Sequence, residues 1–174
     1  MTFAATERSY FDKLSMTEDC MSNTIIIGLG NPILSDDGAG VKAARLLQQR
    51  LEQDADIEVI ELYAGGLRLM DALAGHRRAV IIDAMQTGQA PGTVRKFSLA
   101  DLPPTRNIAC SHDVNLATAL ELGKTMGQQV PADIVIYGIE AADVTTFSET
   151  LTRAVQRAVT DLVETILRDE LKSN

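Results

Sequence analysis

Three short runs of largely apolar residues constrain the fold of this chain more than any other feature. They are Thr24–Ile27, Ala79–Ile82 and Ile134–Tyr137, and β-branched side chains are frequent in each of them. A strand without polar alternation has both of its faces buried, which is typical of the interior of a parallel sheet. These runs therefore predict a sheet that helices cover on both faces.

Helical periodicity separates these strands and completes an α/β pattern. Apolar residues recur at helical spacing in four segments, residues 38–51, 67–73, 115–126 and 148–171. Two more strands are predicted at residues 57–62 and 93–99, and the second of them returns from the turn Pro91–Gly92. The alternation predicts a three-layer α/β fold around a mostly parallel sheet, with the first strand between the second and the third.

Length and charge exclude several classes of protein. The 174 residues suit one domain, which we place at residues 23–172. Residues 1–22 lack the apolar segment of a secretory signal, so we expect a disordered or dispensable leader, with Met21 as an alternative start. The net charge of −8 argues against nucleic acid or an anionic membrane surface as the main partner. No apolar run reaches the ~18 residues of a membrane helix, and two cysteines suit a reducing compartment, so we expect a cytoplasmic protein, monomeric by default.

Polar residues that follow the first and third strands are the first candidates for a functional site. The carboxyl ends of neighbouring parallel strands meet at one edge of the sheet, where open α/β folds bind their ligands. The segment Gly28–Gly40 follows the first strand and contains Asp36 and Asp37, and Asp83 ends the third strand. We therefore expect these carboxylates to lie at the same edge.

Three interpretations compete for the segment Gly28–Gly40. A dinucleotide-binding fingerprint requires glycine where Ile33 stands, and two adjacent carboxylates would repel a pyrophosphate. A structural interpretation makes Ser35 or Asp36 the N-cap of the helix that follows, a role worth ~1 kcal/mol. A functional interpretation places a carboxylate in the crevice as a metal ligand or catalytic group, and this segment alone leaves the last two interpretations open.

Asp83 and His112 favour the functional interpretation. Asp83 ends an otherwise apolar strand and precedes no helix that it could cap. His112 lies on a loop that could reach the same edge, whereas His76 is expected to be structural. Two carboxylates and one imidazole suit a divalent transition metal. Cys110 is two residues from His112, a spacing that need not bring the side chains together, so we expect a structural cysteine rather than a nucleophile.

Four motifs occur in a fixed order along the chain. They are Ile27–Pro32 with Asp36–Val41, Ile81–Ala84 with Pro91–Thr93, Ser111–His112, and Tyr137–Glu140. This ordered set resembles the motifs of the [NiFe]-hydrogenase maturation endopeptidases, and the resemblance spans residues 24–168. The resemblance implies a five-stranded, twisted α/β fold. It also implies an enzyme that removes a short C-terminal extension from the hydrogenase large-subunit precursor after nickel insertion.

The resemblance also assigns roles to individual residues. Asp37, Asp83 and His112 fall on the catalytic, metal-contacting positions, and we expect Asp36 to support them by organising the turn and the following helix. Many members have Glu where Asp37 stands and Pro where Ala141 stands. The implied metal is nickel, which we expect the substrate to bring, and other divalent ions such as cadmium are expected to substitute for it. The expected partner is the hydrogenase large-subunit precursor.

Two other functions compete with this one. Peptidyl-tRNA hydrolases also have Gly-Leu-Gly-Asn-Pro after a first strand, but they continue with a Thr-Arg-His-Asn segment and have a basic surface that faces tRNA. This chain has Ser35–Gly38 in that region and is acidic, which excludes that function. A non-catalytic α/β module that binds nickel or a partner protein through the same crevice is the alternative. For the endopeptidase, the nucleophile is water that either nickel polarises or a carboxylate activates, as in aspartic-type proteases.

Overall fold

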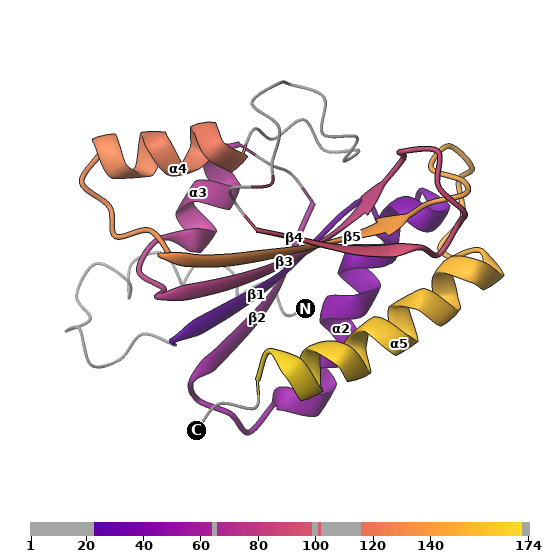
Figure 1. Cartoon of the computed structure of the whole chain (residues 1–174), viewed down its shortest axis with the longest axis horizontal. Coiled ribbons are helices and arrows are strands. Elements are labelled where there is room, and N and C mark those ends of the chain that lie inside the picture. Colours follow the sequence, from indigo (N-terminus) through magenta and orange to yellow (C-terminus); the bar gives the residue numbers. More distant parts are fainter. Residues whose placement is uncertain (1–22, 64–65, 99–100, 102–115, 172–174) are drawn as a thin grey trace, which may run out of the picture.

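The computed structural model describes residues 23–63, 66–98, 101 and 116–171, and its centre is a five-stranded sheet (Figure 1). The strands are β1 (Thr24–Leu29), β2 (Ile57–Leu62), β3 (Arg78–Met85), β4 (Val94–Ser98) and β5 (Asp133–Glu140). Their order across the sheet is β2-β1-β3-β5-β4. Every neighbouring pair is parallel except β4 and β5, which are antiparallel. The predicted mostly parallel sheet, with β1 between β2 and β3, is therefore confirmed.

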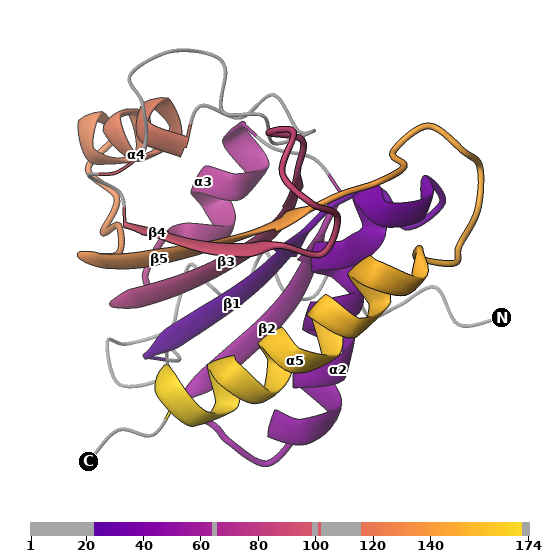
Figure 2. The same cartoon turned by 45° about the vertical axis from the view of Figure 1, so that its right-hand side comes forward.

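Helices cover both faces of this sheet, as predicted. They are α2 (Ala39–Leu51), α3 (Leu67–Leu73), α4 (Leu116–Thr125) and α5 (Arg153–Asp169), and a 3-10 helix, η2 (Ser35–Gly38), precedes α2. Figures 1 and 2 show α2 and α5 on one face and α3 and α4 on the other. Within the described residues, none of these helices combines the length and the apolar content needed to cross a bilayer.

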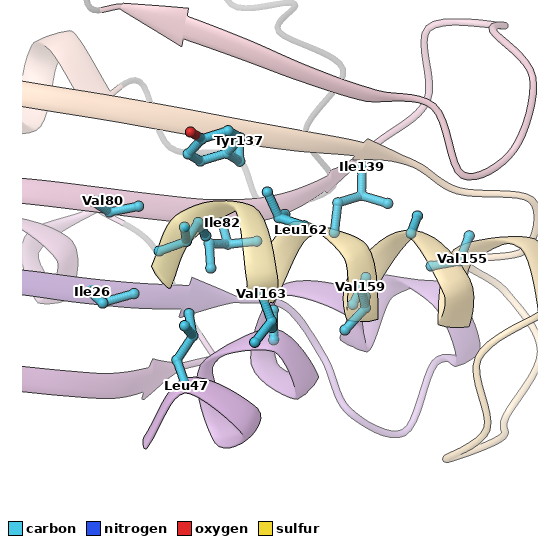
Figure 3. Packing of buried hydrophobic residues seen from close by; sticks show 14 of the residues in the cluster. Ile26, Leu47, Val80, Ile82, Tyr137, Ile139, Val155, Val159, Leu162 and Val163 are labelled. Atoms are coloured by element: carbon cyan, nitrogen blue, oxygen red, sulfur yellow. The ribbon is translucent and has the colours of Figure 1, made fainter. Parts of the chain in front are cut away.

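The two apolar cores explain why the strand sequences lack polar alternation. In β1, Ile26 packs in the core beneath α2 and α5, whereas Ile25 and Ile27 pack in the core beneath α3 and α4. Figure 3 shows Val159 and Leu162 of α5 among the residues of the first core. Complete burial of such a side chain contributes ~1.5–3 kcal/mol, so both faces of the central strands stabilise the three layers.

Several element boundaries differ from the predicted ones. The third and fifth strands continue beyond their apolar runs, so Asp83 lies inside β3 and is paired with Gly138 of β5. The last helix begins at Arg153 rather than at residue 148, because Ser148 forms an isolated parallel bridge with Leu34. Gly38, the first residue of the predicted helix 38–51, belongs instead to η2, and α2 begins at Ala39.

A buried carboxylate ties the end of α5 to the sheet. Glu170 accepts hydrogen bonds from Lys96 at 2.6 Å, from the hydroxyl of Tyr137, and from the guanidinium of Arg78. Burial alone would raise the pKa of Glu170, but the hydrogen bonds from Lys96, Tyr137 and Arg78 outweigh burial and hold that pKa below its ordinary value. This cluster fixes the amino-terminal side of the sheet, opposite the edge that carries Asp37 and Asp83.

Replacing Glu170 by Gln should lower the free energy of unfolding at neutral pH by about 1.5–3 kcal/mol, because hydrogen bonds to a charged group are lost. Since folding lowers the pKa of Glu170, its contribution is complete above the ordinary value of 4.5 and is lost as the pH falls through the folded-state pKa. The difference between E170Q and the parent in urea unfolding should therefore narrow in acid. E164Q, which alters an exposed pair with Arg50, should change stability by less than ~0.5 kcal/mol. If the free energies of unfolding of E170Q and the parent differ equally in acid and at neutral pH, the role given to the charge of Glu170 is wrong.

Candidate functional site

The start of α2 rests directly on the ends of β1 and β3. A Cβ atom at Gly40 would lie 2.2 Å from the carbonyl oxygen of Ile82 and 2.3 Å from that of Leu29. Only glycine permits this approach, because any side chain would collide with the backbone of both strands. The preceding turn η2 consequently lies against β3, which brings Asp37 to the strand end that carries Asp83.

Asp37 is enclosed by the loop that follows β1. Its side chain is buried, and Oδ2 accepts a hydrogen bond from the backbone N–H of Asn31 at 2.9 Å. Gly30 has a φ of +142°, and a Cβ at this position would lie 2.0 Å from the carbonyl oxygen of Asp37. The glycine therefore allows the loop after β1 to pass directly against the backbone of Asp37.

Asp83 supplies the second buried carboxylate at this edge. It is only 2% exposed, and its Oδ1 accepts a hydrogen bond from the N–H of Ala84 at 2.8 Å. A carboxylate in the interior of a sheet is costly to desolvate, so its presence in an apolar strand indicates a purpose other than packing. Asp37 and Asp83 thus place two carboxylates on adjoining elements, where they could bind a cation or activate a water molecule.

The predicted third ligand, His112, lies outside the described residues, as does Cys110. Within the part of the chain that the structure describes, no group of three His, Cys, Asp or Glu side chains is arranged to hold a metal ion. The structure therefore brings Asp37 and Asp83 to one edge, while the full set with His112 stays a prediction. His76 is buried and forms a 3.1 Å contact with Glu58, which agrees with the structural role expected for it.

Asp36 is fully buried and does not cap a helix. Its Oδ2 accepts hydrogen bonds from the N–H groups of Ala142 and Asp143 at 2.9 and 3.1 Å and from the hydroxyl of Thr152 at 2.9 Å. Its Oδ1 accepts a bond from the N–H of Thr152 at 2.7 Å. The predicted N-cap role of Asp36 or Ser35 is wrong, because neither η2 nor α2 has a side-chain cap.

The partners of Asp36 all belong to the connection between β5 and α5, residues 141–152. Figure 2 shows this orange connection beside the start of α2. Ser35 adopts a left-handed φ of 48°, and its N–H donates to the carbonyl of Ser148 at 2.7 Å. Asp36 therefore supports the candidate site by joining η2 to a distant loop, and the supporting role predicted for it has a different physical basis.

Glu140 organises a second loop in the same manner. Its Oε1 accepts N–H bonds from Thr87, Gly88 and Gln89 at 2.7, 2.8 and 3.2 Å, and its Oε2 accepts the hydroxyl of Thr87 at 2.7 Å. Burial alone would raise the pKa of Glu140, but these hydrogen bonds outweigh it and lower the pKa. Sequence reasoning assigned Glu140 no role. The available signal was an acidic residue at the end of an apolar run, the same signal that identified Asp83.

Replacing Asp36 by Asn should lower the free energy of unfolding by about 2–4 kcal/mol, well above the ~1 kcal/mol of a cap. The amide keeps one acceptor oxygen but sets an N–H₂ group against N–H donors of the loop. Urea unfolding should show the loss, and amide hydrogen exchange should increase across residues 141–152. The matched control is E149Q, an exposed acid-to-amide change in the same loop, which should stay within ~0.5 kcal/mol. Equal stability of D36N and E149Q would contradict this role.

The fold is similar to those of solved hydrogenase maturation proteases. The hydrogenase maturating endopeptidase HybD from Escherichia coli matches with a TM-score of 0.70 and 24% identity over 83% of this chain and 90% of that chain. The [NiFe] hydrogenase maturation protease HybD from Thermococcus kodakarensis matches with a TM-score of 0.67 and 26% identity over 84% and 97%, respectively. The α/β fold with a five-stranded sheet is thus confirmed.

Sequence comparison agrees with the structural one. The family model HycI, hydrogenase maturation protease, matches residues 41–169. The hydrogenase expression/formation protein HoxM of Cupriavidus necator is 28% identical over 142 residues, which cover 80% of this chain and 70% of that protein. The hydrogenase 2 maturation protease of Escherichia coli is 26% identical over 117 residues, which cover 66% of this chain and 71% of that protein. This chain therefore belongs to the hydrogenase maturation protease family.

Proposed function

We propose that this chain is an endopeptidase that removes the C-terminal extension of a [NiFe]-hydrogenase large-subunit precursor after nickel insertion. The observation that carries the proposal is the pair of buried carboxylates, Asp37 and Asp83, on adjoining elements at the ligand-binding edge of a maturation-protease fold. Both carboxylates are buried at the carboxyl ends of β1 and β3, where open α/β folds bind their ligands.

In this proposal Asp37, Asp83 and His112 recognise the nickel that the precursor brings. Carboxylate and imidazole donors suit a divalent transition metal, so the residue types fit the ion. A divalent ion supplies a Lewis acid for a nearby carbonyl or water. The carboxylates of Asp37 and Asp83 hold the cation. In an aspartic-type endopeptidase, a carboxylate within hydrogen-bond reach of a water molecule also serves as the general base that activates this water.

The first test is incubation of the full chain with nickel-loaded and nickel-free forms of the precursor, followed by mass spectrometry. We expect a mass loss at the C-terminus of the nickel-loaded precursor and an unchanged mass for the nickel-free form. D83N should abolish the mass loss, because it removes a charged ligand while keeping the size of the side chain. D71N is the control, since Asp71 is an exposed residue of α3. Binding of the nickel-loaded precursor without any mass loss would favour the non-catalytic module instead.

The second test is calorimetric titration of the full chain with a nickel or cadmium salt. D37N, D83N and H112A should each weaken metal binding by at least about tenfold, as expected for the loss of a ligand. D37N and D83N should both remain folded, because D37N keeps an acceptor oxygen for the N–H of Asn31 and D83N keeps one for Ala84. D71N should bind metal as the parent does. If D37N and D83N bind metal as tightly as the parent, the assignment of these ligands is wrong.

A further inference from the structure

The side chains of Asp83 and Glu140 lie on the same face of the sheet. Successive side chains of a strand point to opposite faces. In β3, Ile81 packs in the core beneath α3 and α4, whereas Ile82 packs in the core beneath α2 and α5, so Asp83 points to the face of Ile81. In β5, Ile136 also packs beneath α3 and α4, which places Glu140, four residues later in the same strand, on that face as well.

The strand register brings these two carboxylates near one another. Asp83 is paired with Gly138 and Met85 with Glu140, in one uninterrupted ladder. Neighbouring strands lie ~4.8 Å apart and each residue advances ~3.3 Å, so the Cα atoms of Asp83 and Glu140 are about 8 Å apart. A Cβ at Gly138 would lie 2.7 Å from Sδ of Met85, which places the Met85 side chain on this face too. Glu140 therefore belongs to the surroundings of Asp83.

Glu140 holds the connection between β3 and β4, residues 86–93, at two points. Its carboxylate accepts the four hydrogen bonds from residues 87–89 that are described above, and its carbonyl accepts the N–H of Gly92 at 2.8 Å. Figures 1 and 2 show this connection at the end of the sheet where α2 begins. Because the side chain of Glu140 points to the face of Asp83, residues 87–89 fold back toward that face. They are named the wall below.

Packing of apolar side chains does not fix this connection. Residues 86–91 are all exposed, and the connection contains no charged residue of its own. Glu140, in contrast, is only 2% exposed, and burial of a carboxylate is costly unless hydrogen bonds compensate for it. The fold thus uses a buried charge to order an exposed loop at the ligand-binding edge. Loops that a rigid scaffold holds in one place are the usual carriers of binding and catalytic contacts.

We propose that Glu140 is a positioning residue, which keeps the wall beside Asp83 so that the wall orients the precursor segment containing the bond that is cut. This inference rests on the proposed function and extends it to a residue that does not touch the reacting atoms. Glu140 acts through its acceptor oxygens on the loop, and it neither transfers a proton nor binds the cation. Since a displacement of ~1 Å can cost ~100-fold in rate, loosening the wall should lower kcat more than it changes KM.

The experiment measures cleavage of the nickel-loaded precursor by the parent, E140A, E140Q and E52A. E140A removes every acceptor and should lower kcat by about tenfold or more while KM changes by less than about threefold. E140Q keeps an acceptor oxygen for the N–H groups of the wall, and its N–H₂ can donate to the hydroxyl oxygen of Thr87, so both constants should stay within about threefold of the parent. E52A removes an exposed carboxylate after α2, at the opposite edge, and should behave as the parent.

Two further readouts accompany the kinetics. Amide hydrogen exchange at residues 87–89 should be faster in E140A than in E140Q, and all variants should bind a nickel or cadmium salt as the parent does. If E140A does not fold, E140D takes its place, because its carboxylate ends one methylene short of the wall and should cause the same loss of kcat. A kcat for E140Q as low as that of E140A would show that charge or a proton is needed and would overturn the positioning role. An unchanged kcat in E140A would overturn it as well.

A second measurement separates this inference from the proposed function. A photo-cross-linking amino acid is placed at the exposed Gln89 of the wall, in a D83N background, and the protein is irradiated with a saturating amount of nickel-loaded precursor. The control site is Gln53, which is exposed after the end of α2. Cross-links from position 89 to the C-terminal region of the precursor that E140A weakens support the wall, even if the parent cleaves nothing and the proposed function fails. Cross-links no stronger than those from position 53 would overturn the wall, and cleavage by the parent would leave the proposed function intact.

Discussion

The close packing of α2 on the sheet is the constraint on which the candidate site depends. Because Gly40 leaves no side chain between the helix and the carbonyl groups of Leu29 and Ile82, η2 is brought onto the carboxyl edge of β1 and β3. Asp37 thereby reaches the edge of the sheet near which Asp83 lies in β3. A larger residue at position 40 would lift the helix from both strands and separate the two carboxylates.

Four buried carboxylates at this edge divide into two kinds. Asp36 and Glu140 are surrounded by N–H and hydroxyl donors, and each fixes the path of a loop. Asp37 follows Asp36 in the chain, and Asp83 lies in β3, which pairs with the strand that ends at Glu140. Asp37 and Asp83 are the candidates for binding and catalysis. The position of Asp37 is therefore linked to the loop that Asp36 holds, because the same turn carries both residues. A rigid supporting set of this kind is what a catalytic constellation requires to keep its geometry.

Much of the fold could be predicted because its signals are local. The apolar runs of β1 and β3 and the alternation with helices predicted the layers, the place of β1 between β2 and β3, and the edge that carries Asp37 and Asp83. The exact ends of the helices and strands were harder to predict from the sequence. Nothing in the composition of residues 148–152 distinguishes a helical turn from the extended segment that bridges Leu34. The strand β3 likewise extends through Asp83 because β5 continues to pair with it beyond the apolar run.

By itself the sequence determined the α/β layers, the candidate carboxylates and the ordered motifs of the family, since periodicity and motif spacing are properties of neighbouring residues. Only the tertiary structure decided what Asp36 does, because its hydrogen-bond partner Thr152 lies 116 residues away along the chain. The same holds for Glu140, which accepts hydrogen bonds from a loop 51–53 residues earlier in the chain. Hydrogen bonds between distant segments form only when the chain has folded, and no local pattern in the sequence encodes which donors will meet a given carboxylate.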